Sequence, residues 1–224
     1  VAKRPKWIFG LLFALASAAV FALLGQWQLD RTFTVVEPAA ENEQVFVLNQ
    51  IATPGAALTV EAANVLVSAN IMLDQSNVYI VSNRLQQSGD EIVSGYWLIA
   101  NSGALLADND TTGSLTVAIG FSESLETIEA AREELQSSML AQAFLESTGR
   151  YLQTEAPVVS PDDSKPYLLG SLSLAQLVNL YSSDPVESFA GFLALDAEPG
   201  LGLDPINLPA QQVGTSVNWL TLFY

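Results

Sequence analysis

The sequence contains no cysteine and no histidine among its 224 residues. Without cysteine, the chain has no disulfide framework, no thiol nucleophile and no thiolate ligands for zinc or an iron–sulfur cluster. Without histidine, it lacks the commonest general base, the commonest metal ligand and the usual axial ligand of haem. Phosphate-binding loops of the G-x-x-x-x-G-K-[ST] type are also missing. We therefore expect a protein that is not an enzyme and that holds no metal and no cofactor.

Positive charge is scarce as well. Charged residues make up 14% of the chain, and eight lysines and arginines stand against 24 aspartates and glutamates, for a net charge of −16. Three of the eight, Lys3, Arg4 and Lys6, lie in the first six positions, so the rest of the chain is strongly acidic. Such a surface repels phosphate backbones, which excludes nucleic acid as a partner. The acidic surface could serve solubility alone or could receive a basic partner, and the sequence leaves both open.

A long apolar run follows the basic start. No charged residue occurs from Trp7 to Leu24, and a helix of that length spans about 27 Å, close to the roughly 30 Å of a bilayer's hydrocarbon layer. We interpret residues 1–31 as a cytoplasmic basic start and a transmembrane helix. The basic residues then keep the N-terminus in the cytoplasm and place the acidic domain outside it. A cleaved signal peptide is the alternative interpretation of the same pattern.

Small residues recur every fourth position within this run, at Gly10, Ala14, Ala18 and Ala22. This spacing places them on one helix face, where small side chains let a second helix approach closely. We predict that this face binds a partner helix in the membrane.

The rest of the chain divides into a linker over residues 32–44 and a domain over residues 45–215. Short runs rich in β-branched and aromatic residues, bounded by turn formers, predict strands; before the helix they are Val45–Ile51, Val65–Leu73, Val78–Ser82, Tyr96–Ala100 and Leu115–Phe121. The sequence Gln86–Glu91 predicts the turn of a hairpin that joins Asn77–Arg84 to Gly95–Asn101. Asn101–Gly103 predicts a further turn.

Beyond these strands the apolar spacing changes to that of a helix. Glu123–Gln142 has this periodicity, with Ser122 as the expected N-cap. Phe144–Gln153 predicts a strand, Ser173–Tyr181 a short helix and Phe189–Asp196 another strand. The domain is thus expected to be a mainly antiparallel α+β domain with one long helix, or a small barrel.

Motifs along the chain carry a resemblance to a known family. The junction after the apolar run, Leu24–Arg31, reads L-G-x-W-Q-L-x-R and resembles the signature of the surfeit locus protein 1 family. Val78–Arg84, Gly95–Trp97 and Gly149–Pro157 resemble later segments of that family, in the same order. Family members are membrane proteins that assist cytochrome c oxidase biogenesis. The resemblance is to a bacterial member, and it adds four residues of the junction to the predicted partner-binding set: Gly25, Trp27, Gln28 and Arg31.

The resemblance implies a function and a second membrane span. It implies a membrane-anchored accessory or assembly factor that docks on cytochrome c oxidase subunits, or a stable component of a cytochrome bcc–aa3 supercomplex. Residues 216–224, with Val217–Tyr224 apolar, stand where the family begins its second transmembrane helix. Some members are thought to hold haem a through a histidine there, whereas this chain has Asn218-Trp219-Leu220 and no histidine. A free-standing, membrane-anchored binding domain is the alternative function, and an enzyme with a carboxylate pair is a third.

Overall fold

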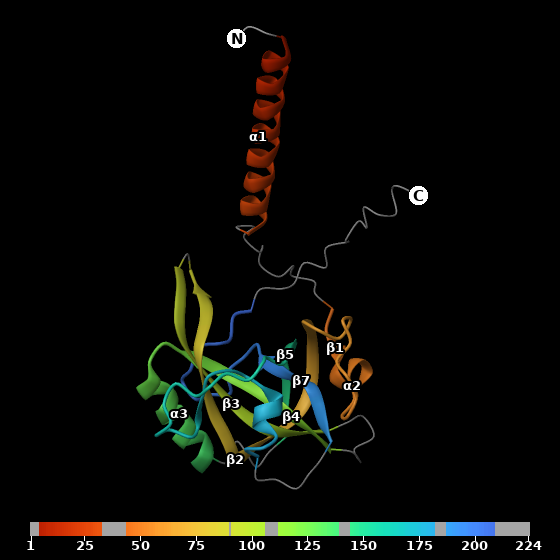
Figure 1. Ribbon diagram of the computed structural model, residues 1–224. Helices are drawn as coiled ribbons and strands as arrows, with labels where there is room; N and C mark the ends of the chain where they lie inside the picture. Colours follow the sequence, from red (N-terminus) through yellow and green to blue (C-terminus); the bar gives the residue numbers. More distant parts are fainter. Residues whose placement is uncertain are drawn as a thin grey trace. The chain divides into compact units, whose positions relative to one another are not determined.

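The computed structural model describes residues 5–32, 44–89, 91–105, 112–138, 144–181 and 187–208. The chain forms two compact units (Figure 1): Val1–Pro38 with Gln211–Tyr224, and Ala39–Ala210. Most of the predicted linker and the whole of the predicted second span, residues 216–224, lie outside the described residues.

The first unit contains one long helix, α1, Pro5–Thr32, of 28 residues. Its side chains from Ile8 to Leu24 are exposed, except that of Ser17, which is half-buried. Within the described part of the chain, no helix combines the length and the apolarity that crossing a membrane requires. The predicted helix is present, and its passage through a membrane remains a prediction.

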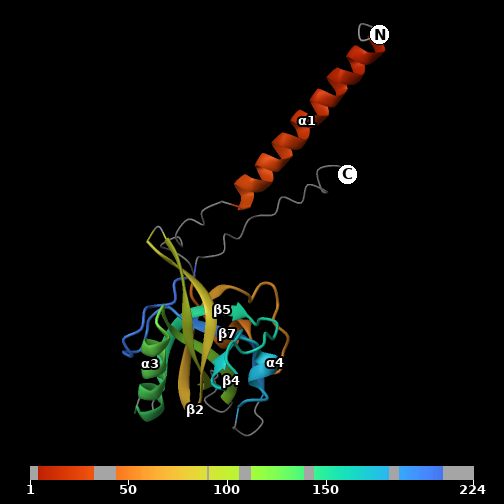
Figure 2. The same cartoon turned by 60° about the vertical axis from the view of Figure 1, so that its left-hand side comes forward.

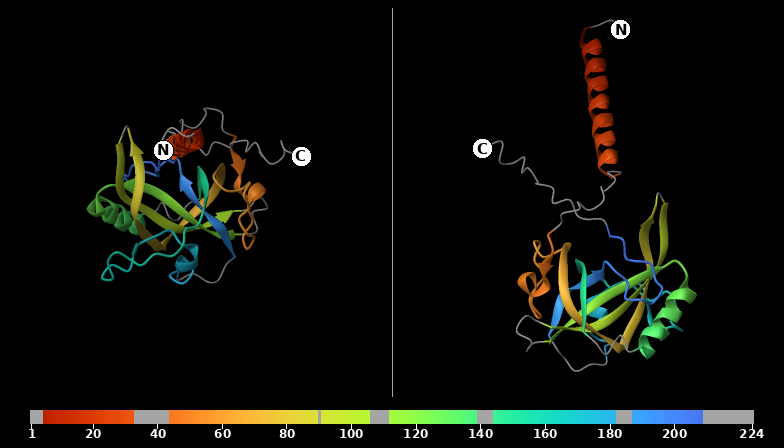
Figure 3. Two further views of the ribbon diagram at one scale, coloured as in Figure 1. Left: turned by 45° about the horizontal axis from the view of Figure 1, so that its top comes forward. Right: turned by 180° about the vertical axis from the view of Figure 1, so that it is seen from behind.

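The second unit is built on one mixed, seven-stranded sheet. Its strands are β1 Phe46–Val47, β2 Val65–Ser88, β3 Glu91–Leu105, β4 Thr112–Ser122, β5 Leu145–Gln153, β6 Leu168–Leu169 and β7 Ser188–Leu195. The order is β1-β2-β3-β4-β7-β5, and β5 pairs back with β2, so the sheet closes on itself (Figure 3). The pairs β1–β2, β2–β6 and β4–β7 are parallel. The other pairs, β2–β3, β2–β5, β3–β4 and β5–β7, are antiparallel and contain most of the paired residues, so the sheet is mixed and, as predicted, mainly antiparallel.

The longest strand, β2, joins two segments that the sequence separated. Val65–Leu73 and Val78–Ser82 belong to a single strand of 24 residues, with a register shift between them. The polar residues between the two segments form a bulge, in which Asp74 accepts hydrogen bonds from Ser76 N at 2.8 Å and from Asn77 Nδ2 at 2.6 Å. Because the carboxylate satisfies the extra residues locally, the strand continues through them.

The hairpin between β2 and β3 is confirmed, and its turn is tighter than predicted. Pairing continues to Ser88 and Glu91, inside the segment assigned to the turn. The second predicted turn, Asn101–Gly103, is wrong, because these residues belong to β3. Asn101 pairs with β4, and Ser102 and Gly103 pair with both β2 and β4. Asn101 is buried there, and its side-chain oxygen accepts a hydrogen bond from Ser114 Oγ at 2.7 Å.

The first predicted strand of the domain is also corrected. Within Val45–Ile51, only Phe46 and Val47 pair as β1, and the chain then turns into the short helix α2, Leu48–Ile51. β1 occupies the edge of β2 at Val67 and Ser68, just beyond the last partner of β3 at Asn70. The helical turn buries Leu48 in the core, which a continued strand along the surface would leave exposed.

The long predicted helix is present as α3, Leu125–Ser137, shorter than Glu123–Gln142. Its N-cap is Ser124, whose Oγ accepts from Thr127 N at 3.3 Å. The predicted cap, Ser122, is the last residue of β4, and its Oγ accepts from Ser124 N at 3.1 Å. Ile128, Ala131 and Leu135 are the buried residues of α3. Their spacing of three and four residues places them on one face of the helix.

The later elements agree with the sequence prediction. β5 and the short helix α4, Leu174–Leu177, lie within the predicted segments, and β7 begins one residue before its predicted segment. Figure 2 shows α3 and α4 apart, on different sides of the sheet. Two apolar clusters fill the unit, the larger including residues of α3 such as Ile128, and the smaller including Trp97, Phe121, Leu172 and Phe192. The smaller cluster lies beneath the polar site described next.

Candidate functional site

The site begins at a bulge near the end of β2. The register with β3 shifts between Val81 and Arg84, and Asn83 has φ of 57°. This left-handed conformation is tolerated by asparagine better than by most side chains. The sequence Ser82-Asn83-Arg84 therefore breaks the alternation of the strand, and Arg84 becomes mostly buried over the sheet, with 13% of its side chain exposed.

Arg84 makes a two-pronged ion pair with Glu155, which follows β5. Arg84 Nη1 donates to Glu155 Oε1 at 2.5 Å and Nη2 donates to Oε2 at 3.1 Å, while Nε donates to the carbonyl of Ser82 at 3.3 Å. The planar guanidinium matches the carboxylate in this geometry, which lysine cannot reproduce. The Glu155 side chain is 37% exposed, so one side of the pair reaches solvent.

Trp97 on β3 lies beneath the guanidinium. Arg84 Cζ is 5.0 Å from the centroid of the Trp97 ring, within the range of a cation–π contact. Trp97 is 5% exposed and packs on Phe192 at 6.3 Å between centroids. Two residues earlier, Gly95 is needed for close packing, because a Cβ there would lie 2.7 Å from Phe121 Cζ and would also meet the carbonyl of Ser122.

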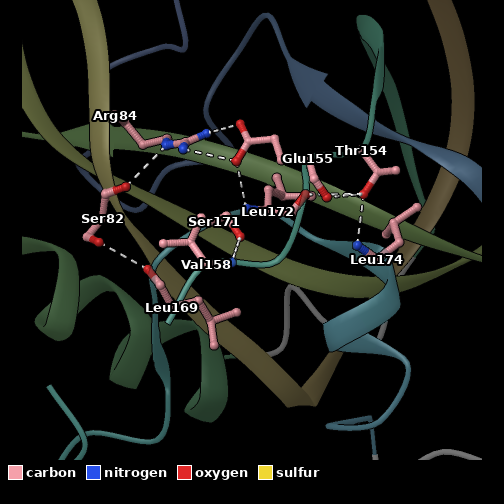
Figure 4. Close-up of polar contacts among 9 residues, drawn as sticks. All are labelled: Ser82, Arg84, Thr154, Glu155, Val158, Leu169, Ser171, Leu172 and Leu174. Carbon is pink, nitrogen blue, oxygen red and sulfur yellow. Dashed lines mark hydrogen bonds and ion pairs between the residues drawn. The ribbon is translucent and has the colours of Figure 1, made fainter. Parts of the chain in front are cut away.

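Hydrogen bonds fasten Glu155 and its neighbours to the segment before α4 (Figure 4). Glu155 Oε2 accepts from Leu172 N at 2.9 Å, and Glu155 N donates to Leu172 O at 2.9 Å. On either side, Thr154 Oγ1 accepts from Leu174 N at 2.9 Å and Ser171 Oγ accepts from Val158 N at 3.0 Å. Ser82 Oγ donates to Leu169 O at 3.1 Å, so the bulge of β2 is joined to the same segment. We call Arg84, Trp97 and Glu155 the Arg84 cluster.

Comparison with protein families identifies the chain. The model of the SURF1 family matches residues 15–222, nearly the whole sequence. The chain belongs to the SURF1 family. This family takes part in cytochrome c oxidase assembly. No curated protein and no solved structure matches the chain significantly.

The Arg84 cluster joins three of the segments on which the resemblance to the SURF1 family depended. Arg84 ends the segment Val78–Arg84, Trp97 ends Gly95–Trp97 and Glu155 belongs to Gly149–Pro157. Their contact was not predicted from the sequence. One signal was available: only five basic residues follow the first six positions, in a chain with 24 acidic ones, so a mostly apolar strand that ends in arginine predicts a carboxylate partner.

The predicted partner-binding residues lie on α1. Gly10, Ala14, Ala18 and Ala22 are exposed, and a Cβ added to Gly10 would meet no atom within 4 Å. Because they recur every fourth residue on one continuous helix, they share a face of α1. Gly25, Trp27, Gln28 and Arg31 have helical backbones, and their side chains lie outside the described residues. The role of all eight in binding remains a prediction.

A second polar group lies on the other side of the sheet, around α3. Glu129 Oε1 accepts from Lys165 Nζ at 2.6 Å and from the Tyr167 hydroxyl at 2.9 Å. Arg132 Cζ is 4.4 Å from the centroid of the Tyr167 ring, and Arg132 Nε donates to Val78 O at 2.9 Å. We call these four residues the Glu129 cluster. The hydrogen bond from Lys165 holds the pKa of the Glu129 carboxyl below its usual value, and the same bond raises the pKa of Lys165.

Both clusters can fasten and orient segments. Among the described residues, no group of three or more histidines, cysteines, aspartates or glutamates could hold a metal ion. The carboxylates of both clusters are already bound to cations and to N–H or O–H donors. The chemistry that the Arg84 cluster supports best is therefore the shaping of a surface on the second unit.

Proposed function

We propose that this chain is an accessory or assembly factor of cytochrome c oxidase that acts by docking on oxidase subunits. The match of the SURF1 family to residues 15–222 carries the proposal. The Arg84 cluster supports it, because residues of three family-like segments fasten one surface of the second unit. A factor that docks needs such a fixed surface, since ordering a mobile one on binding costs free energy.

The proposal includes a place for the protein. We place the membrane anchor at Trp7–Leu24, a run without charged residues whose described apolar side chains are exposed on α1. The basic start then lies in the cytoplasm and the second unit outside it. If the docking is permanent, the chain is a stable component of a cytochrome bcc–aa3 supercomplex.

Histidine ligation of haem does not fit this chain. The sequence has no histidine and no cysteine, and the described methionine, Met72 on β2, is 36% exposed and not enclosed in a pocket. The segment that replaces the family's histidine, Asn218–Leu220, offers no imidazole. The proposed function is therefore contact between proteins, and no step in it uses haem bound by this chain.

Affinity purification of the tagged full chain in mild detergent tests the proposal. We expect oxidase subunits to co-purify, identified by mass spectrometry and by the absorbance of their haem. Recovery of the bait without any oxidase subunit would contradict docking and would favour the free-standing binding domain. The same assay under increasing detergent separates a permanent component from a transient factor.

A pair of variants tests the small-residue face in the same assay. Ala14→Leu/Ala18→Leu should weaken association by about 1–2 kcal/mol, because larger side chains push a partner helix away. Ala16→Leu/Ala19→Leu adds the same bulk away from this face and serves as the control. Equal recovery of oxidase with both variants would show that Gly10, Ala14, Ala18 and Ala22 do not form the contact.

A further inference from the structure

A cavity of about 700 Å³ lies at one end of the closed sheet, separate from the Arg84 cluster. Its lining combines carboxylates with buried apolar side chains, and includes Glu123, Asp196, Asp204, Arg150, Phe121 and Ile206. A volume of this size is typical of sites that take a small ligand or a few side chains.

The topology explains why acidic residues gather here. β4 and β7 are parallel neighbours, so their carboxyl ends lie at the same end of the sheet. Glu123 follows the last residue of β4, and Asp196 follows the last residue of β7. Asp204 is brought to them by paired backbone hydrogen bonds with Phe121, of 2.8 and 2.9 Å.

The walls of the cavity are held in place by further bonds. Asp196 N donates to Thr148 O at 3.1 Å, and the turn before Asp204 uses the positive φ of Gly200 and Gly202. The segment after this turn runs beside the β2–β3 hairpin (Figures 1 and 3). There Gln86 Nε2 donates to Pro205 O at 3.0 Å and Gln86 Oε1 accepts from Asn207 N at 3.3 Å. The cavity is therefore formed before any ligand arrives.

The charge of the lining is negative. Glu123, Asp196 and Asp204 are exposed, whereas the one basic residue, Arg150, is 5% exposed and donates to Asn64 O at 3.1 Å. Leu66, Val93 and Leu208 also line the cavity and are half-buried, so they supply an accessible apolar floor above the buried Phe121 and Ile206. Carboxylates around an apolar floor complement a side chain with a long apolar stem and a cationic head.

We propose that this cavity receives an arginine side chain from a basic, extended segment of a partner protein. The proposal rests on the proposed function in that it names the chemistry of the docking partner. Arginine fits better than lysine because its guanidinium presents five donors to carboxylates on different segments, Glu123 after β4 and Asp204 in the segment after β7. An acidic domain that docks through this cavity gains both steering and specificity from the partner's positive charge.

Peptide binding to the full chain tests the cavity directly. The probe is a fluorescein-labelled peptide, Ala-Leu-Arg-Leu-Arg-Ala, and its control contains citrulline, the neutral isostere, in place of each arginine. We expect saturable binding of the arginine peptide in fluorescence anisotropy, at least about tenfold tighter than the citrulline peptide, because only the former makes charge-assisted hydrogen bonds. Equal binding of the two peptides overturns the proposal, and this comparison needs no variant.

Two matched variants then locate the contact. Glu123→Gln/Asp204→Asn removes two charges from the cavity and should weaken the arginine peptide about tenfold. Glu126→Gln/Glu133→Gln removes two charges from the exposed side of α3 and should change binding less than about twofold. If both variants weaken peptide binding equally, the peptide is attracted to the acidic surface in general, and the proposal that it binds in the cavity is wrong. Melting temperatures of both variants confirm that each is folded.

The two proposals fail in distinguishable ways. If the arginine peptide binds as described but no oxidase subunit co-purifies with the wild-type chain, the cavity stands and the oxidase partner is wrong. If oxidase co-purifies equally with the wild type and with Glu123→Gln/Asp204→Asn over a series of salt concentrations, docking stands and the cavity is not its site.

Discussion

The Arg84 cluster and the Glu129 cluster both combine an ion pair with an arginine–aromatic contact, and they differ in which cation makes each interaction. Each contains one carboxylate, an aromatic ring and an arginine stacked on that ring. In the Arg84 cluster a single guanidinium both pairs with Glu155 and lies over Trp97. In the Glu129 cluster the two tasks are divided, because Lys165 pairs with the carboxylate while Arg132 stacks on Tyr167.

The two clusters also differ in how far their side chains are exposed to solvent. In the Arg84 cluster, Trp97 is 5% exposed, the Arg84 side chain 13% and the Glu155 side chain 37%. In the Glu129 cluster, the side chains of Lys165 and Glu129 are 31% and 28% exposed. The cation of the Arg84 cluster is therefore better shielded from water and salt than Lys165, whereas the carboxylates of both clusters reach solvent. The Arg84 cluster therefore extends from the core, at Trp97 and Arg84, to the surface, at Glu155, whereas both charged groups of the Glu129 ion pair lie near the surface.

The largest expected effect comes from removing the ring beneath Arg84. Trp97→Ala should lower the free energy of unfolding by about 3–5 kcal/mol, because it opens a cavity in the smaller apolar cluster and exposes the guanidinium. Chemical denaturation of the full chain, followed by circular dichroism, measures the loss. Phe144→Ala serves as the control, since Phe144 is an aromatic residue that is 46% exposed. A similar loss in both variants would contradict the assignment of Trp97 to the core.

The next effect is the removal of charge from the ion pair. Glu155→Gln should lower the free energy of unfolding by about 1–2 kcal/mol. The loss is smaller than for breaking a fully buried ion pair, because one side of the Glu155 carboxylate reaches solvent. A double-mutant cycle with Arg84→Gln measures the coupling between the two side chains. We expect the double variant to cost less than the sum of the single ones, and strict additivity would show that the bonds contribute nothing to stability.

A substitution in the bulge that turns Arg84 towards Glu155 should lower the free energy of unfolding by about 1 kcal/mol. Asn83→Ala places a residue with a Cβ but no polar side chain in the left-handed conformation at φ of 57°. Asn83→Gly is the matched variant, because glycine adopts this conformation without strain, and it should be nearly neutral. Thermal melts of the two variants should therefore differ in this order, and the reverse order would contradict the bulge.

The smallest effect, and one that depends on pH, belongs to the Glu129 cluster. The pKa of Glu129 is lower in the folded chain than its usual value, so its ionised form stabilises the fold at pH values above that usual value. This contribution is lost as the pH falls through the lowered pKa. The melting-temperature difference between wild type and Glu129→Gln should thus be largest near neutral pH and should vanish in acid. Added salt should reduce it more than it reduces the effect of Glu155→Gln, and an equal salt response would remove the distinction between the clusters.

Local patterns in the sequence predicted much of the fold. Phe144–Gln153 and Phe189–Asp196 read as strands because β-favouring runs ended at turn formers, and α3 read as a helix from its apolar spacing. The errors arose where tertiary contacts override local preference. Asn101–Gly103 has a composition typical of turns, but its polar groups find partners across β3 and β4, so it remains in a strand.

The candidate site could be predicted only in part. Arg84 and Glu155 both lay in segments that resembled the family, yet nothing in a single sequence states that residues 71 positions apart are paired. The parallel pairing of β4 with β7, which gathers Glu123 and Asp196, is equally non-local. Such pairings depend on the order of strands in the closed sheet, and hydrophobic periodicity carries no information about that order.

The place of β7 in the sheet has a consequence for how the protein is made. β7 fills the gap between β4 and β5, pairing in parallel with one and antiparallel with the other. A growing chain therefore exposes two unpaired strand edges until residues 188–195 have been synthesised, late in the sequence. Exposed edges invite pairing with other chains, so the unfinished domain is vulnerable to aggregation after β5 has been synthesised and before β7 is complete. When β7 enters the sheet, it pairs with the free edges of β4 and β5 at the same time.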